Sequence, residues 1–364
     1  MKILVTVLFP DVHGPLQKIM PGLMEGLFSA GCTIGTEPWG RHHNNESLHE
    51  KVFSRFQDII RICRRLKRER FDVLLLQTAH DWNTLIRDVL LIFFAGSHRP
   101  VTIAQLHGSR SDWLTGPGHL LFKLATRVFL MLTDSILLLS QEELKEWRAF
   151  YPNINAYLVS NPFISKQNAL CESNPLAFSK THHDVPVLLF VGRLMFEKGI
   201  FDLLDAMAIV KQTTHCHLLV VGEGPEKERV KKRIGELSLE SSVTLTGYLS
   251  GDDLTNAYLH SDVFVLPTFW AEGFPTVITE AMNAGLPIVT TRVRGNADHL
   301  TEGRNTLFVA PKDPRSLAQT LLKLMADSDL RTKMSKINKA EVKKFRPDLV
   351  APEYVRALRL TPGR

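Results

Sequence analysis

Residues 272–285 read EGFPTVITEAMNAG and bring two carboxylates, a turn and the start of a helix into one short stretch. Pro275 suits the first position of a helix, and Gly285 suits the position just beyond its end. Glu272 then precedes the helix, and Glu280 lies about 7.5 Å along its axis at 1.5 Å per residue. Because a helix N-terminus offers unpaired N–H groups and the positive end of the helix dipole, we expect an anion to bind between the two carboxylates.

The backbone donors at this expected anion site are few. Pro275 has no N–H group, so only Phe274, Thr276 and Val277 can donate. A carboxylate on each side of the anion suits a ligand with hydroxyl groups at both ends and a negative middle. A nucleoside diphosphate sugar has this layout.

Buried strands alternate with helical patterns along the whole chain, which predicts an α/β fold with doubly wound parallel sheets. The predicted strands are Ile3–Phe9, Val73–Gln77, Val101–Gln105, Ser135–Leu139, Ala156–Val159, Val187–Val191, His217–Val221, Val243–Thr246, Val263–Leu266 and Pro287–Thr291. The predicted helices include Leu16–Ala30, Phe201–Gln212, Leu317–Met325, Asp329–Phe345 and Pro352–Leu360.

Length and composition narrow the function. A chain of 364 residues suits two domains, and a net charge of +6 is too small to argue for nucleic acid as a partner. The four cysteines lie far apart, without metal-site or disulfide spacing, which favours a reducing, cytoplasmic setting. No apolar run approaches the roughly 18 residues of a membrane-spanning helix, so we expect any membrane association, at the inner face, to be peripheral.

Three further segments place glycines and charges at predicted strand ends. They are VGRL at 191–194 followed by EKG at 197–199, VVGEGP at 220–225, and TGY at 246–248. With the Glu-x7-Glu spacing of 272–280, these segments make the chain resemble a retaining glycosyltransferase of the GT-B fold, glycosyltransferase family 4. The resemblance is strong over roughly 185–345 and diffuse over 1–165.

The resemblance implies two Rossmann-like domains facing across a cleft. Residues 1–165 would form an N-terminal acceptor-side domain, 166–186 a linker, and 187–347 a nucleotide-sugar donor domain. A C-terminal crossover helix at about 348–364 would return to the first domain.

Four charged residues are the candidates for the reaction and for ribose binding. Arg193 and Lys198 follow a predicted strand, at the end where open parallel sheets bind ligands, and two cations there can neutralise a leaving diphosphate. Without the motif, each would be read as a solvated surface charge. The resemblance assigns Arg193 and Lys198 to the diphosphate. It assigns Glu280 to the ribose hydroxyls and Glu272 to the donor sugar.

Glycines mark the expected nucleotide pocket. Gly222 and Gly224 resemble part of a dinucleotide fingerprint, but position 227 is Lys, so the pattern alone is a weak signal. The resemblance implies a tight turn beside the nucleotide here, with Gly247 and Tyr248 near the base.

The N-terminal half offers two candidate residues. Gly14 lies in the first strand-to-helix turn, where the family usually has a pair of glycines, and Pro15 follows it here. His107 follows the predicted strand 101–105, where family members often place a His close to the donor sugar. A lone His is also often structural, and both interpretations stay open.

The function implied is transfer of a sugar from a UDP- or GDP-sugar to an acceptor hydroxyl, with retention of anomeric configuration. The family is not thought to need a metal. Polysaccharide, lipopolysaccharide or glycolipid assembly, with a glycan or lipid-linked acceptor, follows from the family alone. A nucleotide-sugar hydrolase or isomerase, with His107 as the suspected base, and a catalytically silent nucleotide-sugar-binding relative are the alternatives. A dinucleotide oxidoreductase ranks lower because the first strand lacks its Gly-rich turn.

The stretch Lys51–Arg70 holds eight basic residues against two acidic ones, and its apolar residues follow helical spacing. One interpretation is a helix on the sheet with a solvated basic face, on which Arg61, Arg64, Arg65 and Arg68 face water. The other is peripheral contact with anionic lipid or a phosphorylated acceptor. The apolar residues of 113–131 are expected either to add an apolar contact or to join the core.

Overall fold

Two parallel sheets of six strands organise the chain in the computed structural model, which describes residues 1–12, 14–43, 46–96, 99–165 and 185–362. The chain divides into two units. Unit 1 comprises Met1–Ile164, Ala271–Phe274 and Lys344–Arg364, and unit 2 comprises Ser165–Trp270 and Pro275–Lys343. The predicted linker 166–186 falls mainly on 166–184, outside the described residues.

The sheet of unit 1 has the order β2-β1-β3-β4-β5-β6, with every neighbouring pair parallel. The central strands are almost continuous runs of buried Val, Ile and Leu, as expected for a sheet covered on both faces. The strands are β1 (Lys2–Val7), β2 (Thr33–Pro38), β3 (Val73–His80), β4 (Val101–Ser109), β5 (Ser135–Leu138) and β6 (Ala156–Leu158).

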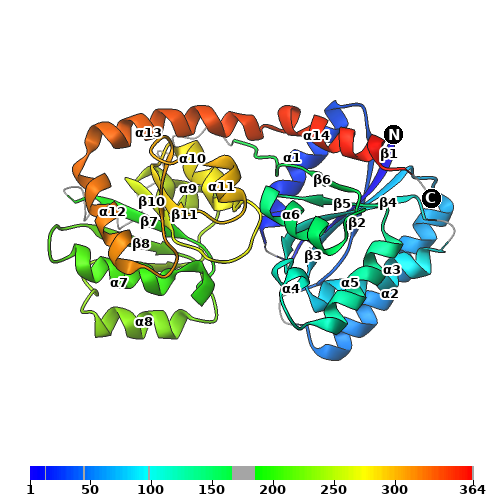
Figure 1. The fold of residues 1–364 in the computed structure, drawn as a ribbon, viewed down its shortest axis with the longest axis horizontal. Coiled ribbons are helices and arrows are strands. Elements are labelled where there is room, and N and C mark those ends of the chain that lie inside the picture. The colour runs from blue at the N-terminus through cyan, green and yellow to red at the C-terminus, as the bar shows by residue number, and fades with distance from the viewer. Residues whose placement is uncertain (13, 44–45, 97–98, 166–184, 363–364) are drawn as a thin grey trace. The chain divides into compact units, whose positions relative to one another are not determined.

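Two hydrophobic cores cover the faces of this sheet. One core packs α2, α3, α5 and α6 through residues such as Ile62, Leu91, Phe129 and Trp147, and the other packs α1 and α14 around Tyr354. Figure 1 shows α2, α3 and α5 on one side of the sheet and α1 and α14 on the other. The helices are α1 (Pro15–Ser29), α2 (Leu48–Arg68), α3 (Trp82–Ala95), α4 (Asp112–Thr115), α5 (Leu120–Leu132), α6 (Gln141–Phe150) and α14 (Pro347–Leu360).

Helix α2 begins with a capping box, in which Ser47 and Glu50 satisfy each other's backbone N–H groups. Arg64 and Arg68 are exposed as expected, whereas Arg61 and Arg65 face water only in part, with 39% and 28% of their side chains exposed. Arg61 Nε lies 3.0 Å from one carboxylate oxygen of Glu37 on β2, and Arg65 Nη1 lies 2.8 Å from the other. A buried carboxylate needs cationic partners, and these two arginines supply them.

The sheet of unit 2 has the order β12-β11-β10-β7-β8-β9, also with every pair parallel. The first strand, β7, therefore lies beside both β8 and β10, and the strand order reverses at that point. The strands are β7 (Val187–Val191), β8 (His217–Val221), β9 (Val243–Gly247), β10 (Val263–Leu266), β11 (Ile288–Thr291) and β12 (Thr306–Val309).

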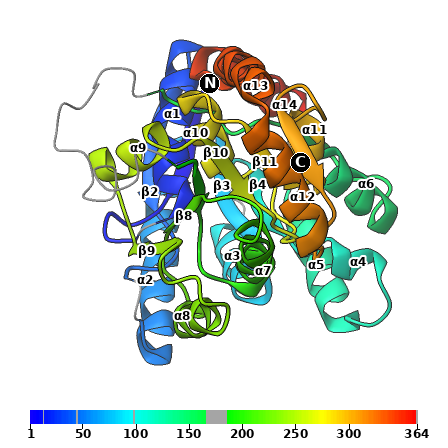
Figure 2. The ribbon, with the colours of Figure 1, turned by 90° about the vertical axis from the view of Figure 1, so that its left-hand side faces the viewer.

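Helices connect these strands or follow the last of them, and they can be followed from green to orange in Figure 2. They are the 3-10 turn η2 (Phe196–Lys198), α7 (Ile200–Val210), α8 (Lys227–Glu236), α9 (Gly251–Leu259), α10 (Thr276–Ala284), α11 (Gly295–His299), α12 (Pro314–Ala326), α13 (Ser328–Glu341) and the 3-10 turn η3 (Val342–Phe345).

Several predicted boundaries change for identifiable reasons. The last helix begins at Pro347 and not at Pro352, because Pro347 occupies the first helical position that the sequence argument gave to Pro352. Pro275 precedes α10 with an extended backbone, φ −62° and ψ 128°, so the helix begins one residue later at Thr276. Gly285 adopts the left-handed conformation just past the helix, as predicted.

Candidate functional site

The candidate site of unit 2 lies where its strand order reverses. The loop after β7 carries Arg193 and Lys198, and the segment after β10 leads into α10, which carries Glu280. Because β7 and β10 are parallel neighbours, these loops leave the same edge of the sheet. Open α/β sheets bind ligands at this edge, beside the point of reversal.

Glycines let the backbones of adjacent loops touch at this edge. A Cβ on Gly222 would lie 1.9 Å from the carbonyl oxygen of Gly192, and one on Gly224 would lie 2.3 Å from that of Leu194. The N–H of Gly222 donates to the oxygen of Gly247 at 2.8 Å. The loops after β7, β8 and β9 are thereby fixed to one another, and only glycine fits at 222 and 224.

The cationic loop after β7 is short and held at its end. Arg193 is exposed and Lys198, the last residue of η2, is half-buried. Gly199 follows with a left-handed φ of 75°, and a Cβ there would lie 2.2 Å from the carbonyl oxygen of Pro267. The close approach of the two backbones fixes where Lys198 leaves the loop.

The start of α10 offers backbone donors without a side-chain cap. Thr276 and Val277 are its first two residues, and no side chain caps the N-terminus. Ile278 N–H donates to the carbonyl of Pro275 at 3.0 Å, which closes the first turn. The helix therefore presents its positive end at the reversal point, as an anion would require.

Glu280 is held by a tyrosine that the sequence argument missed. The hydroxyl of Tyr258 on α9 donates to Glu280 Oε2 at 2.8 Å and lies 3.3 Å from the carbonyl of Val277. Burial, together with the Glu280 carboxylate, raises the pKa of Tyr258 well above its usual value, so the phenol stays protonated and keeps donating. A buried tyrosine hydroxyl needs a hydrogen-bond partner, but the sequence alone does not identify that partner.

Tyr248 follows directly after β9 and is 60% exposed. Gly247 before it has φ +74°, and the ladder between β8 and β9 shifts register there. The turn places Tyr248 at the same edge as Gly222. An aromatic ring of this kind can stack on a flat ligand.

Glu272 and Phe274 belong to unit 1, whereas Glu280 belongs to unit 2. Glu272 forms an isolated antiparallel bridge with Gly108, next to His107. Phe274 is buried, with its ring centroid 5.3 Å from that of Phe345. The structure thus brings Glu272 beside the residue after His107, although the two are far apart in sequence.

His107 lies within β4 and is part of a polar chain across three strand ends. Its Nε2 lies 2.5 Å from Oε1 of Gln77 on β3, and the N–H of Gln77 donates to the hydroxyl of Thr6 on β1 at 2.7 Å. Burial lowers the pKa of His107 to about 3, so the ring is neutral near pH 7.

Gly14 caps α1 with an extended backbone, φ 175°. A Cβ there would meet only the side chain of Leu8, at 3.7 Å. The position therefore has no structural need for glycine.

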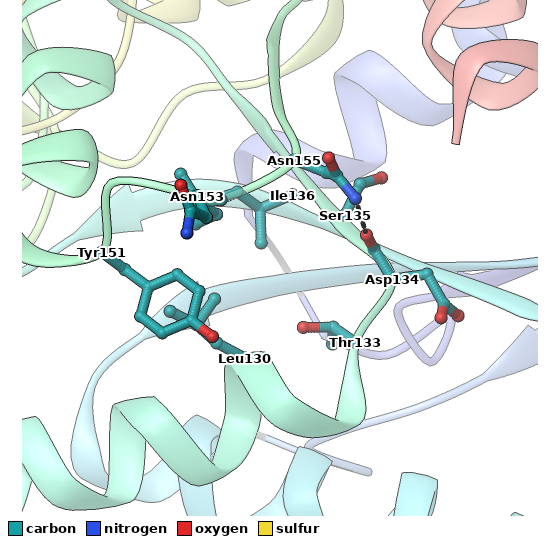
Figure 3. A pocket seen from close by; sticks show the side chains of 9 residues that line it. Leu130, Thr133, Asp134, Ser135, Ile136, Tyr151, Asn153 and Asn155 are labelled. Carbon is teal, nitrogen blue, oxygen red and sulfur yellow. Dashed lines mark hydrogen bonds between the residues drawn. The ribbon is translucent and has the colours of Figure 1, made fainter. Parts of the chain in front are cut away.

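A small cavity lies at the opposite edge of the unit 1 sheet, where β5 and β6 begin (Figure 3). Asn155 Nδ2 donates to the carbonyl of Asp134 at 3.2 Å beside it, and Tyr151 borders its mouth. Its volume of about 130 Å³ is well below the few hundred Å³ of small-molecule sites. It contains none of the predicted site residues.

Within the described parts of the chain, no cluster of three His, Cys, Asp or Glu residues could hold a metal ion. The described helices also include none long and apolar enough to cross a membrane.

Comparison with known proteins identifies a domain within the chain. Residues 175–341 match the profile described as glycosyl transferases group 1. These residues are a group 1 glycosyl transferase domain. The resemblance found in the sequence is thereby confirmed.

Two curated relatives match about half of this chain. A glycosyltransferase of Methanocaldococcus jannaschii described as uncharacterized is 31% identical over 49% of this chain and 45% of its own length. A lipopolysaccharide core biosynthesis glycosyltransferase of Rhizobium meliloti, LpsE, is 28% identical over 50% of this chain and 52% of its own. The matching part of the chain spans about half the length of these relatives.

Structural similarity extends over both units. The HepE protein of Anabaena, solved in complex with UDP and glucose, superposes with a TM-score of 0.77 at 17% identity, over 99% of this chain and 100% of that one. The expected GT-B-like fold, with two parallel α/β sheets, is confirmed for a chain that carries a group 1 glycosyl transferase domain.

Proposed function

We propose that the chain transfers a sugar from a nucleoside diphosphate sugar to an acceptor hydroxyl, with retention of anomeric configuration. One observation carries the proposal. Three segments of unit 2 leave the same edge of its sheet. They are the loop with Arg193 and Lys198, the turn at Gly222, where only glycine fits, and the start of α10, which has no side-chain cap. This arrangement supplies cations and backbone donors for a diphosphate, with the Glu280 carboxylate one helical turn further on.

The chemical step needs stabilisation of a leaving group. The bond between the anomeric carbon and the diphosphate oxygen breaks, and a bond from the acceptor oxygen to the same carbon forms. Arg193 and Lys198 neutralise the charge that develops on the diphosphate. The acceptor proton passes to the leaving phosphate oxygen, so the reaction requires neither a side-chain base nor a bound metal.

Glu280 is proposed to accept hydrogen bonds from the ribose hydroxyls. Tyr258 supports this role because its phenol donates to one carboxylate oxygen and so holds the side chain of Glu280 in place. Gly247 and Tyr248 are proposed to border the base, and UDP is the favoured nucleotide because HepE was solved with it. Glu272 is proposed to select the donor sugar.

The acceptor is proposed to be a glycan or lipid-linked sugar of polysaccharide, lipopolysaccharide or glycolipid assembly. The name of the Rhizobium meliloti relative supports this class. We assign the acceptor to unit 1. A cytoplasmic location at the inner face of a membrane, with peripheral contact through Lys51–Arg70, would suit a lipid-linked acceptor.

The test begins with a thermal-shift panel of UDP- and GDP-sugars. Ligand at a hundred times its Kd should stabilise the chain by about 2.7 kcal/mol. The stabilising donor is then incubated with candidate acceptors, and the anomeric configuration of the product is read by NMR. A product of inverted configuration would contradict the proposal, as would donor hydrolysis unaffected by any acceptor.

A further inference from the structure

Helix α3 exposes an apolar stripe that has no charged residue on it. Trp82, Ile86, Leu90, Phe93 and Phe94 recur at helical spacing along its outer side, with exposures from 40% to 66%. At 1.5 Å per residue the stripe is about 18 Å long. The charged residues of this helix, Arg87 and Asp88, pair with each other on the inner side.

The helices on each side of α3 continue the apolar surface. Helix α3 packs against both α2 and α5, and the ring of Phe56 on α2 meets that of Phe94 edge-on at 6.5 Å. On α5, Leu121 and Leu124 are 72% and 57% exposed. We call the exposed apolar side chains of these three helices the apolar face; they are Val52, Phe53, Phe56, Trp82, Ile86, Leu90, Phe93, Phe94, Leu120, Leu121, Leu124 and Met131.

This concentration is local. In the described part of the chain, twenty large apolar side chains are exposed, and these twelve lie on one side of one sheet. Unit 2 exposes only Phe196, Tyr248 and Leu259 among its described residues. Contiguous apolar surface of this extent marks an interaction site, whereas scattered single residues do not.

Cations border the apolar face. The outer side of α2 is apolar over its first half, at Phe53 and Phe56, and basic over its second half, at Arg64 and Lys67 with Arg68 beside them. Among the residues that the structure describes, no salt bridge engages these three cations. The outer side of α5 adds Arg127.

Carboxylates are almost absent from the same surface. Asp58 and Asp88 are buried, and the exposed Glu50 and Asp81 cap the first turns of α2 and α3. An apolar centre with a cationic border and few anions complements a bilayer with anionic headgroups, in which aromatic and aliphatic side chains enter the interface and Lys and Arg remain at the phosphates.

We infer that the apolar face of α2, α3 and α5 docks this chain on an anionic lipid bilayer. The inference depends on the proposed function in one respect: a lipid-linked acceptor would explain why the enzyme binds a membrane. In this inference the main membrane contact is the apolar stripe of α3, and the basic stretch Lys51–Arg70 has a secondary part. Binding should therefore persist in part at high salt, because apolar insertion is not screened.

The test is cosedimentation of the full chain with vesicles of phosphatidylcholine, alone or mixed with phosphatidylglycerol, at low and high salt. The double variant Ile86→Ser with Phe93→Ser should lower the partition coefficient by about tenfold or more. Phe28→Ser is the matched control, because Phe28 is 73% exposed on α1, on the other side of the sheet, and should leave binding unchanged. Circular dichroism and thermal melts establish that each variant is folded.

A charge variant separates the contribution of apolar insertion from that of electrostatic attraction to anionic lipid. Changing Arg64, Lys67 and Arg68 to Glu should remove the preference for phosphatidylglycerol. If it abolishes binding while Ile86→Ser with Phe93→Ser binds like wild type, the apolar inference is overturned. Full recovery of wild type in the supernatant with either vesicle at low salt would also overturn it.

A second copy of the chain is the alternative partner for the apolar face. Sedimentation velocity of wild type and of the double variant should give the same monomeric mass. A wild-type dimer that the double variant converts to monomer would assign the face to a second copy of the chain instead. The assay contains no donor or acceptor sugar, so its failure leaves the transferase proposal standing, and failure of transfer leaves the lipid inference standing.

Discussion

The two sheets share a strand count and parallel order, but their carboxyl ends differ in chemistry. In unit 2, glycines press the loops together and the loops carry Arg193, Lys198 and the start of α10. In unit 1, the corresponding edge holds the neutral chain of Thr6, Gln77 and His107. The difference teaches that one architecture can present cations at this edge or bury a neutral polar chain there, depending on which residues its strand ends and loops carry.

The largest effect should come from the cations of unit 2. Arg193→Ala or Lys198→Ala should lower kcat by a factor of about 10² or more, since each is proposed to stabilise the leaving diphosphate. Arg229→Ala is a matched control, because this exposed arginine on α8 pairs with the neighbouring Glu226 and lies over the ring of Phe201, away from the loop of Arg193 and Lys198 in the sequence. Steady-state kinetics with the identified donor provide the measurement. Losses that track reduced thermal stability would refute the assignment.

Glycine substitutions compare the two edges directly. Gly222→Ala should lower the free energy of unfolding by more than about 2 kcal/mol, because its Cβ would overlap a carbonyl oxygen. Gly303→Ala, with φ +68° and no atom within 4 Å of the added carbon, should cost only the roughly 1–2 kcal/mol of the backbone conformation. Gly14→Ala in unit 1 should be close to neutral. Urea unfolding measures the free energy of unfolding of all three variants. Equal losses for Gly14→Ala and Gly222→Ala would show that the loops of the two sheets do not differ in their need for glycine.

The two carboxylates of 272–280 should respond differently to substitution. Glu280→Gln should weaken binding of the bare nucleoside diphosphate. Tyr258→Phe should do so by about tenfold, the value of one hydrogen bond to a charged group. Glu272→Gln should leave diphosphate binding nearly intact and impair use of the sugar donor. Titration calorimetry with UDP and with the UDP-sugar separates these outcomes, and equal losses for both ligands in both glutamine variants would exclude the division.

The smallest effect concerns pH and unit 1. Burial lowers the pKa values of His80 and His107 to about 3, whereas unfolded histidines titrate near 6.5. The unfolded chain therefore binds more protons below pH 6.5, so the stability from these neutral rings is complete above that pH and is lost as pH falls toward 3. Urea unfolding between pH 7.5 and about 5 should show a weaker pH dependence in His80→Gln or His107→Gln than in wild type. An unchanged dependence would show that neither ring resists protonation.

Most of the fold could be predicted because its inner strands are continuous apolar runs. The strands Val187–Val191, His217–Val221 and Val263–Leu266 have the predicted bounds. β2 and β12 were not predicted. Both lie at sheet edges; β2 mixes polar with apolar residues and resembles a loop, and β12 has only four residues, too few to show a period.

Local motifs indicated the loops and the helix end of the site, but not the contacts between distant residues. The close approach at Gly222 follows from a glycine pattern that the sequence displays. The pairing of Gly108 with Glu272, the bond from Tyr258 to Glu280 and the ion pairs of Glu37 join residues that no sequence spacing connects. These contacts depend on how the elements pack, which a single sequence does not encode as a readable pattern.

The polypeptide passes between the two units four times, at Ile164–Ser165, Trp270–Ala271, Phe274–Pro275 and Lys343–Lys344. A protease that cuts at Ile164–Ser165 separates residues 1–164 covalently from the rest of the chain, and only non-covalent packing, such as that of Tyr354 in the unit 1 core, then holds the two fragments together. A gene fragment that encodes only 185–343 would carry Phe274 without Phe345, and would expose to water a ring that the whole chain buries. Separate expression of unit 2 therefore requires a polar replacement for Ala271–Phe274.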